Sequence, residues 1–133
     1  MDLSAAHGLK SISVSAFFSC KALKQVLLNE GLETIGKYSF ADCGLERLFV
    51  PGSVRFIGSS AFFINPLTQV RFLGITAHES HNGRVSDNAN DCRSEREHRL
   101  VIGEEAFSDC KDLTQVIFDP GSAVEEIQQT AFQ

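Results

Sequence analysis

A ladder of apolar residues runs along the chain at nearly constant spacing. A small residue followed by Phe recurs five times, and these phenylalanines lie 23, 22, 45 and 25 residues apart. An Ile stands five positions before each Phe. The pairs are Ile12 and Phe17, Ile35 and Phe40, Ile57 and Phe62, Ile102 and Phe107, and Ile127 and Phe132. Self-similarity at such a period predicts a repeat architecture in which each unit stacks on the next.

A second pattern repeats in step with the first. Four six-residue runs have apolar residues at their first, fourth and sixth places: residues 23–28, 45–50, 67–72 and 113–118. Because side chains alternate along a strand, the fourth and sixth places share one face. We therefore predict four parallel strands, one in each coil. The inward residues would be Val26 and Leu28, Leu48 and Val50, Val70 and Phe72, and Val116 and Phe118.

Turn residues and a second apolar segment complete each unit. Pro51-Gly52 and Pro120-Gly121 follow two of the runs, where Pro ends a strand ladder and Gly accepts unusual backbone angles. A short apolar segment, such as Val54 and Ile57, is expected to cover the opposite side of the coil. Burial of each ladder Phe would contribute about 2–3 kcal/mol before the entropy of chain ordering is subtracted.

These residues resemble a known family. Leu45 to Val50, then Pro51-Gly52-Ser53-Val54, then Ile57-Gly58 and Ala61-Phe62 are similar to leucine-rich repeats of the BspA type. The resemblance implies an α/β fold, namely a right-handed leucine-rich-repeat solenoid with parallel β-strands along one face and short helical turns near the A-F-x-x-C segments. It also implies binding of a protein or a surface ligand, often in adhesin-like proteins at the cell surface.

The whole chain, 1–133, is expected to form one repeat domain with an interruption. The repeat core would span 8–73 and 99–132, and the repeats begin and stop within a coil. Solenoids need polar capping units to shield their terminal faces. We therefore expect uncapped ends that pair with further repeats or self-associate.

Residues 75–98 form the interruption. The interval from Phe72 to Ile102 is 23 residues longer than that from Val50 to Ile57, and the extra segment has almost no apolar content. A flexible solvated loop is the simplest interpretation, and an artefact of the gene sequence is another. A metal-binding loop is the functional alternative. Its ligands would come from His78, His81, Cys92 and His98, with oxygen atoms from Asp87 and Asp91.

Composition narrows the functional classes. The chain is 43% hydrophobic with a net charge of −5, and both signs are spread along it, so no phosphate-binding stripe suggests nucleic acid. No apolar stretch reaches the roughly 18–20 residues of a membrane span. No phosphate loop, nucleophile elbow or carboxylate pair indicates an enzyme, and no cofactor is expected. Without a signal peptide the protein would be cytoplasmic if Met1 is the true start, whereas the resemblance implies the cell surface or secretion.

The cysteines favour a structural role. Cys20, Cys43 and Cys110 stand three residues after a ladder Phe, and Asn65 holds this place in the third unit. A disulfide between adjacent coils is geometrically conceivable. We favour reduced, buried thiols, because three cysteines and one Asn do not pair evenly.

The positions between the inward residues of each run give the candidate site. They would face solvent in two rows on the strands, of which one contains Gln25, Arg47, Gln69 and Gln115 and the other contains Leu27, Phe49, Arg71 and Ile117. Arginine and aromatic residues often anchor protein contacts, so the main hypothesis is a ligand-binding strand face. The alternatives are β-propensity alone, which places apolar residues on any sheet, and a passive spacer within a longer repeat protein.

Overall fold

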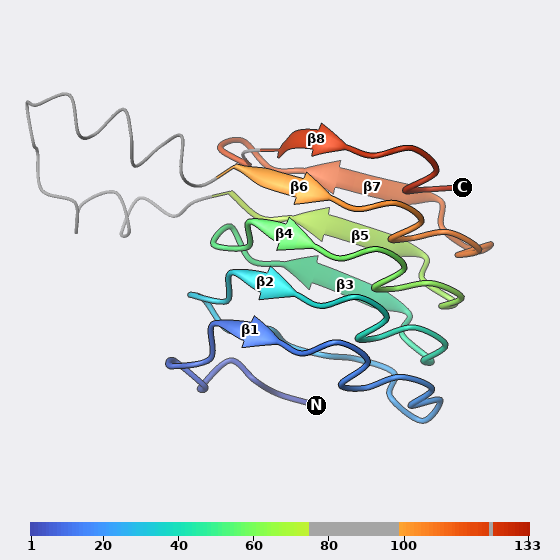
Figure 1. Cartoon of the computed structure of the whole chain (residues 1–133), viewed down its shortest axis with the longest axis horizontal. Coiled ribbons are helices and arrows are strands. Elements are labelled where there is room, and N and C mark those ends of the chain that lie inside the picture. Colours follow the sequence, from blue (N-terminus) through green and yellow to red (C-terminus); the bar gives the residue numbers. More distant parts are fainter. Residues whose placement is uncertain (75–98, 123) are drawn as a thin grey trace, which may run out of the picture.

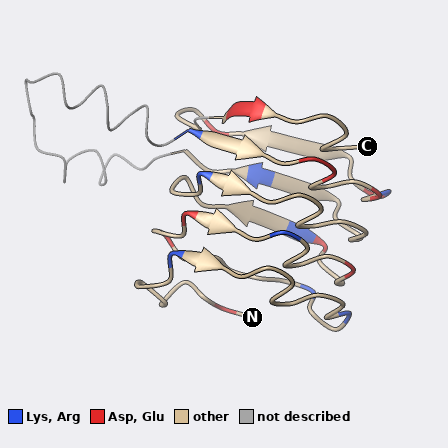
Figure 2. Cartoon of the chain, in the orientation of Figure 1, with Lys and Arg blue, Asp and Glu red and all other residues tan. Residues whose placement is uncertain are grey.

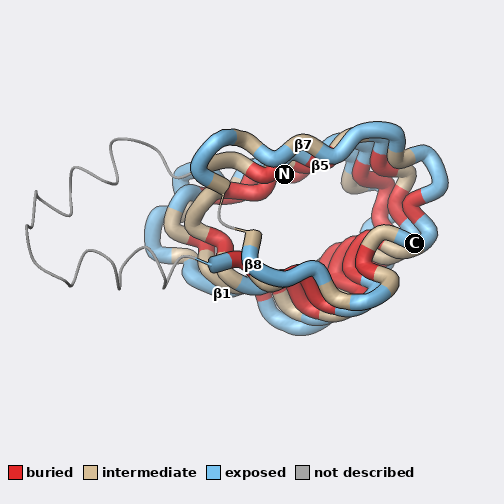
Figure 3. Tube along the Cα trace, turned by 90° about the horizontal axis from the view of Figure 1, so that it is seen from above, coloured by how far each residue is buried: buried red, intermediate tan, exposed pale blue. Residues whose placement is uncertain are grey.

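The computed structural model describes residues 1–74, 99–122 and 124–133. Successive coils stack into a flattened solenoid with a sheet on each of its two broad sides (Figures 1 and 3). One sheet has the order β1-β2-β4-β6-β8 and the other has the order β3-β5-β7. The strands are β1 (Ser11–Ile12), β2 (Thr34–Ile35), β3 (Arg47–Val50), β4 (Phe56–Ile57), β5 (Gln69–Phe72), β6 (Leu100–Ile102), β7 (Gln115–Phe118) and β8 (Val124–Ile127).

The ladder isoleucines align the five-stranded sheet. All four strand pairs are parallel, and their register places Ile12, Ile35, Ile57, Ile102 and Ile127 side by side. The expectation that strands follow only one face of the coil is therefore wrong, because the second apolar segment of each unit also pairs with its neighbours. Within these two- to four-residue strands, backbone hydrogen bonds run between coils as in any parallel ladder.

The three-stranded sheet confirms three of the four predicted strands. β3, β5 and β7 pair in parallel without a register shift. The remaining predicted strand, at Gln25–Leu28 in the first coil, lies outside the sheet. Its only bridge within the described residues joins Leu27 to Asp2. Val26 and Leu28 are nevertheless buried, as the alternation predicts.

The core between the sheets contains a continuous aromatic stack. Phe17, Phe40, Phe62, Phe107 and Phe132 lie face over face, with ring centroids 4.9–5.4 Å apart and interplanar angles of 1–12°. Phe72 forms a T-shaped contact with Phe107 and stacks on Phe118, so it joins the aromatic column to the three-stranded sheet. Figure 3 shows the buried positions along the inner side of each coil.

The described residues contain strands and turns but no helix, so the predicted helical turns and the α/β class are not confirmed. In the first four coils, the residue two places before the ladder Phe and the residue two places after it both have positive φ, such as Tyr38 (56°) and Asp42 (56°) around Phe40. A left-handed residue every four positions interrupts the right-handed backbone that an α-helix needs. Alternate N–H groups instead bond to the next coil, as from Phe40 N to Ala61 O at 2.8 Å.

Burial differs from the prediction in the last coil. Val116 is 36% exposed and Phe118 is 43% exposed, although both were expected to point into the core. Their neighbours one coil earlier in the sheet, Val70 and Phe72, are buried. The reason is stacking, because an inner coil is covered on both sides whereas the last coil packs against a coil on one side only.

Candidate functional site

The structure brings six of the eight predicted site residues together on the outer face of β3, β5 and β7. Register places Arg47, Gln69 and Gln115 in one row. The second row contains Phe49, Arg71 and Ile117. Each of the six is exposed or half-buried, and the residues that alternate with them are buried except in the last coil. Gln25 and Leu27 are also exposed but belong to the segment outside this sheet.

Charge on this face is of one sign. The three strands contain two arginines, Arg47 and Arg71, and no acidic residue (Figure 2). Arg71 is held by Asp119, which follows β7, through an ion pair of 2.8 Å from Nε to Oδ1. This pair joins the guanidinium to the neighbouring coil through Nε, and no described residue is hydrogen-bonded to its terminal NH groups.

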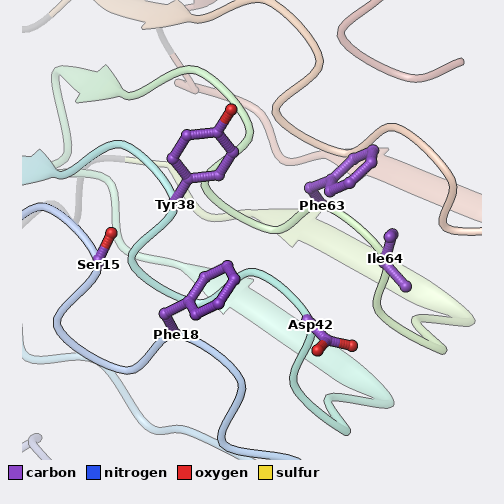
Figure 4. A pocket seen from close by; sticks show the side chains of 6 residues that line it. All are labelled: Ser15, Phe18, Tyr38, Asp42, Phe63 and Ile64. Carbon is purple, nitrogen blue, oxygen red and sulfur yellow. The ribbon is translucent and has the colours of Figure 1, made fainter.

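A second feature lies at the turns that connect the two sheets. Ring and aliphatic side chains from three successive coils surround a hollow of about 520 Å³ (Figure 4). Two of them are strongly exposed, namely Phe18 at 54% and Ile64 at 45%. The lining residues are Ser15, Phe18, Tyr38, Asp42, Phe63 and Ile64.

Sequence reasoning missed this hollow. Its residues stand one or two places from the ladder Phe, at positions whose identity changes from coil to coil. The place directly after the ladder Phe, for example, holds Phe18 and Phe63 in two coils but Ala41 between them. Apolar residues at non-periodic positions beside a buried ladder are the signal that could have indicated it.

The cysteine position serves the core. In successive coils Cys43 Sγ, Asn65 Nδ2 and Cys110 Sγ each donate a hydrogen bond to the ladder-Phe carbonyl of the preceding coil, at 3.1, 2.8 and 3.3 Å. Asn65 also accepts a bond from Leu45 N at 3.2 Å. The described cysteines Cys20, Cys43 and Cys110 are free thiols, but only Cys43 and Cys110 are buried, so the expectation of burial is wrong for Cys20, which is exposed.

Burial shifts the pKa values of Cys43 and Cys110. Desolvation of the thiolate raises the pKa of Cys43, and it raises the pKa of Cys110 to about 11. Both groups therefore remain protonated donors at neutral pH, which suits a structural hydrogen bond rather than nucleophilic chemistry.

The proposed metal ligands cannot be placed. His78, His81, Asp87, Asp91, Cys92 and His98 lie outside the described residues. Among the residues that the structure does describe, no group of three His, Cys, Asp or Glu side chains is arranged to hold a metal ion. The same described part of the chain contains no helix long and apolar enough to cross a membrane.

Comparison with known protein families decides the classification. The BspA type leucine rich repeat region matches residues 2–81 and 95–133, in six copies. The chain belongs to this family. The unmatched residues 82–94 fall inside the predicted interruption. No curated protein and no solved structure matches the chain.

Membership of the BspA-type family gives a general function. Leucine-rich repeats mediate binding of proteins or surface ligands, and they generally act as non-enzymatic scaffolds. A repeat scaffold of this kind offers an extended surface with one set of side chains from every coil. The exposed side chains of this BspA-type coil, rather than its family membership, determine which side a partner contacts.

Proposed function

We propose that this BspA-type chain is a protein-binding module whose partner contacts the outer face of β3, β5 and β7. The observation that carries the proposal is the register of Phe49, Arg71 and Ile117, which forms a row of aromatic, cationic and aliphatic side chains across three coils. Aromatic residues and arginine contribute most of the binding energy in many protein interfaces. Short paired strands hold these side chains on a rigid platform, which lowers the entropic cost of binding.

The charge of this face indicates the kind of partner. The chain as a whole has a net charge of −5, yet β3 and β5 carry arginines and β7 carries no charge. Arg47, together with the part of the Arg71 guanidinium that Asp119 does not contact, would attract an acidic group on a partner. We infer a partner that presents carboxylates beside an apolar contact for Phe49 and Ile117.

A comparison of three immobilised proteins tests this assignment. The wild-type chain, the double variant Phe49→Ala with Arg71→Ala, and the control Phe56→Ala are exposed to the same protein mixture. Phe56 is an exposed residue on the opposite sheet, so its loss matches the aromatic deletion without touching the proposed face. Circular dichroism establishes that all three are folded.

The expected result is a partner retained by the wild type and by Phe56→Ala and lost by the double variant. A truncation of two central interface residues that each contribute at least 1–2 kcal/mol weakens binding by about 30-fold or more. Equal retention by all three proteins would contradict the strand-face proposal. Loss with Phe56→Ala alone would place the interface on the five-stranded sheet.

A further inference from the structure

The hollow between the connecting turns has aromatic walls with a defined geometry. The rings of Phe18 and Tyr38 meet edge to face, with centroids 6.4 Å apart and an interplanar angle of 87°. Phe63 and Ile64 come from the next coil and face the same space (Figure 4). Side chains of this size are normally buried, so their convergence on an open hollow indicates a surface that a ligand covers.

A carboxylate stands at the edge of these walls. Ser19 Oγ donates to Asp42 Oδ2 at 2.7 Å, and Lys21 Nζ lies 3.4 Å from the same oxygen. Among the described residues no partner reaches Asp42 Oδ1, and the side chain is 32% exposed. The hydrogen bond from the Ser19 hydroxyl lowers the pKa of Asp42 below its usual value, and Lys21 makes a smaller contribution in the same direction. The carboxyl group is therefore charged at neutral pH.

One ring of the hollow already binds a cation of the chain itself. Lys37 Nζ lies 5.2 Å from the centroid of the Tyr38 ring, within the range of a cation–π contact. Lys37 is not among the residues that line the hollow, so its ammonium group leaves the cavity itself open. The contact shows that the Tyr38 ring attracts positive charge.

We propose that this hollow is a binding site for the trimethylammonium group of a small choline-type molecule. Three aromatic rings offer cation–π contacts, and the carboxylate of Asp42, which Lys21 contacts through Oδ2, lines the same space and would attract a second cation. A primary ammonium ion needs three hydrogen-bond acceptors, whereas the mainly apolar lining suits a cation with methyl groups on its surface. The site is independent of the strand-face partner.

Nuclear magnetic resonance titration of the full chain with choline chloride tests the proposal. The matched ligand control is 3,3-dimethylbutan-1-ol, which has the shape of choline without its charge, and sodium chloride controls for ionic strength. Choline is expected to shift the amide signals of Ser15, Phe18, Tyr38 and Ile64 in a saturable way, and the neutral alcohol is not.

Variants separate the contributions of ring and charge. Phe18→Leu and Asp42→Asn should each weaken choline binding by about 2- to 5-fold, the range expected for an exposed cation–π or ionic contact. Phe18 is more than half exposed, so its replacement leaves the fold intact. Phe56→Leu, on the opposite sheet, and the Phe49–Arg71 double variant should bind choline as the wild type does.

Three outcomes would overturn the proposal. The first is the absence of saturable shifts with choline. The second is equal binding of the neutral alcohol, which would make the hollow a general apolar site. The third is unchanged affinity in both Phe18→Leu and Asp42→Asn, which would place the bound choline elsewhere.

Discussion

Two coils of this solenoid carry almost the same pattern and differ sharply in burial. In the coil of residues 45–66, Leu48 and Val50 on one sheet and Ile57 on the other are buried. In the coil of residues 113–133, the equivalent Val116, Phe118 and Ile127 are 36, 43 and 48% exposed. The difference shows that an apolar ladder residue is buried by its neighbouring coils and not by its own unit, as nearest-neighbour stability in repeat proteins requires.

The largest expected effect concerns the aromatic column. Phe62 is fully buried and stacks on Phe40 and on Phe107. Phe62→Ala should lower the free energy of unfolding by about 3–5 kcal/mol, because it leaves a ring-sized cavity between two covered coils. Phe132, which stacks only on Phe107 among the described rings, should cost less than half as much when replaced by Ala. Urea unfolding of the two variants measures both values.

Equal losses in the free energy of unfolding for Phe62→Ala and Phe132→Ala would contradict the expected difference between inner coils and the last coil. That result would mean that the last coil is as well supported as an inner one, for instance by association of chains in solution. Unfolding at two protein concentrations separates this possibility, since an association makes the midpoint depend on concentration.

The next largest loss of stability is expected where the backbones of adjacent coils approach each other closely, at Gly58. A Cβ atom added to Gly58 would lie 2.6 Å from Lys37 N in the adjacent coil. Gly58→Ala should therefore cost about 1–3 kcal/mol, since the coils must separate to admit the methyl group. At the equivalent place, directly after the ladder Ile, the last coil carries Gln128. Gly8→Ala is the control, because nothing lies within 4 Å of its added Cβ.

The measurement is again the free energy of unfolding from urea denaturation. A cost for Gly58→Ala no larger than that for Gly8→Ala would show that inner coils adjust their spacing readily. The tight packing that distinguishes them from the last coil would then be without consequence for stability.

Much of the fold could be predicted from the sequence because it depends on periodicity. The Ile and Phe ladders recur in every unit, and stacking converts that recurrence directly into the paired strands and the aromatic column. The left-handed turns could not be predicted in the same way. Tyr38 and Ile64 adopt positive φ without the Gly or Asn that usually marks such a position, because hydrogen bonds between coils impose this conformation.

The candidate sites divide similarly. The rows on β3, β5 and β7 follow from strand alternation, which is a local rule. The aromatic hollow depends on side chains such as Phe18 and Ile64 from different coils, at positions that do not repeat. The exposure of Val116 and Phe118 also lies beyond a local pattern, because their run is the same as that of Val70 and Phe72 and only the neighbouring coils differ.

A smaller effect should appear with pH. Burial raises the pKa of Cys110 from 9.0 to about 11, so the folded chain retains this proton when the unfolded chain loses it. The unfolded state then binds fewer protons, and stability falls by about 1.4 kcal/mol per pH unit between pH 9.0 and about 11. The difference between the urea unfolding midpoints at pH 8 and pH 10 should be smaller in Cys110→Ala than in the wild type. Parallel pH profiles for the two proteins would show that this thiol is open to water when the chain is folded.

The smallest expected effect concerns the ion pair that spans β5 and the last coil. The side chains of Arg71 and Asp119 are 44 and 20% exposed, so water and salt screen their attraction. A double-mutant cycle with Arg71→Ala and Asp119→Ala should give a coupling energy of about 0.2–1 kcal/mol, decreasing as sodium chloride rises from 0.05 to about 0.5 M. A coupling well above 1 kcal/mol that salt leaves unchanged would mean that this pair secures the last coil in place of the packing that it lacks. Arg71 would then serve to stabilise the fold through Asp119, and a strand-face partner would have to bind Phe49 and Arg47 instead.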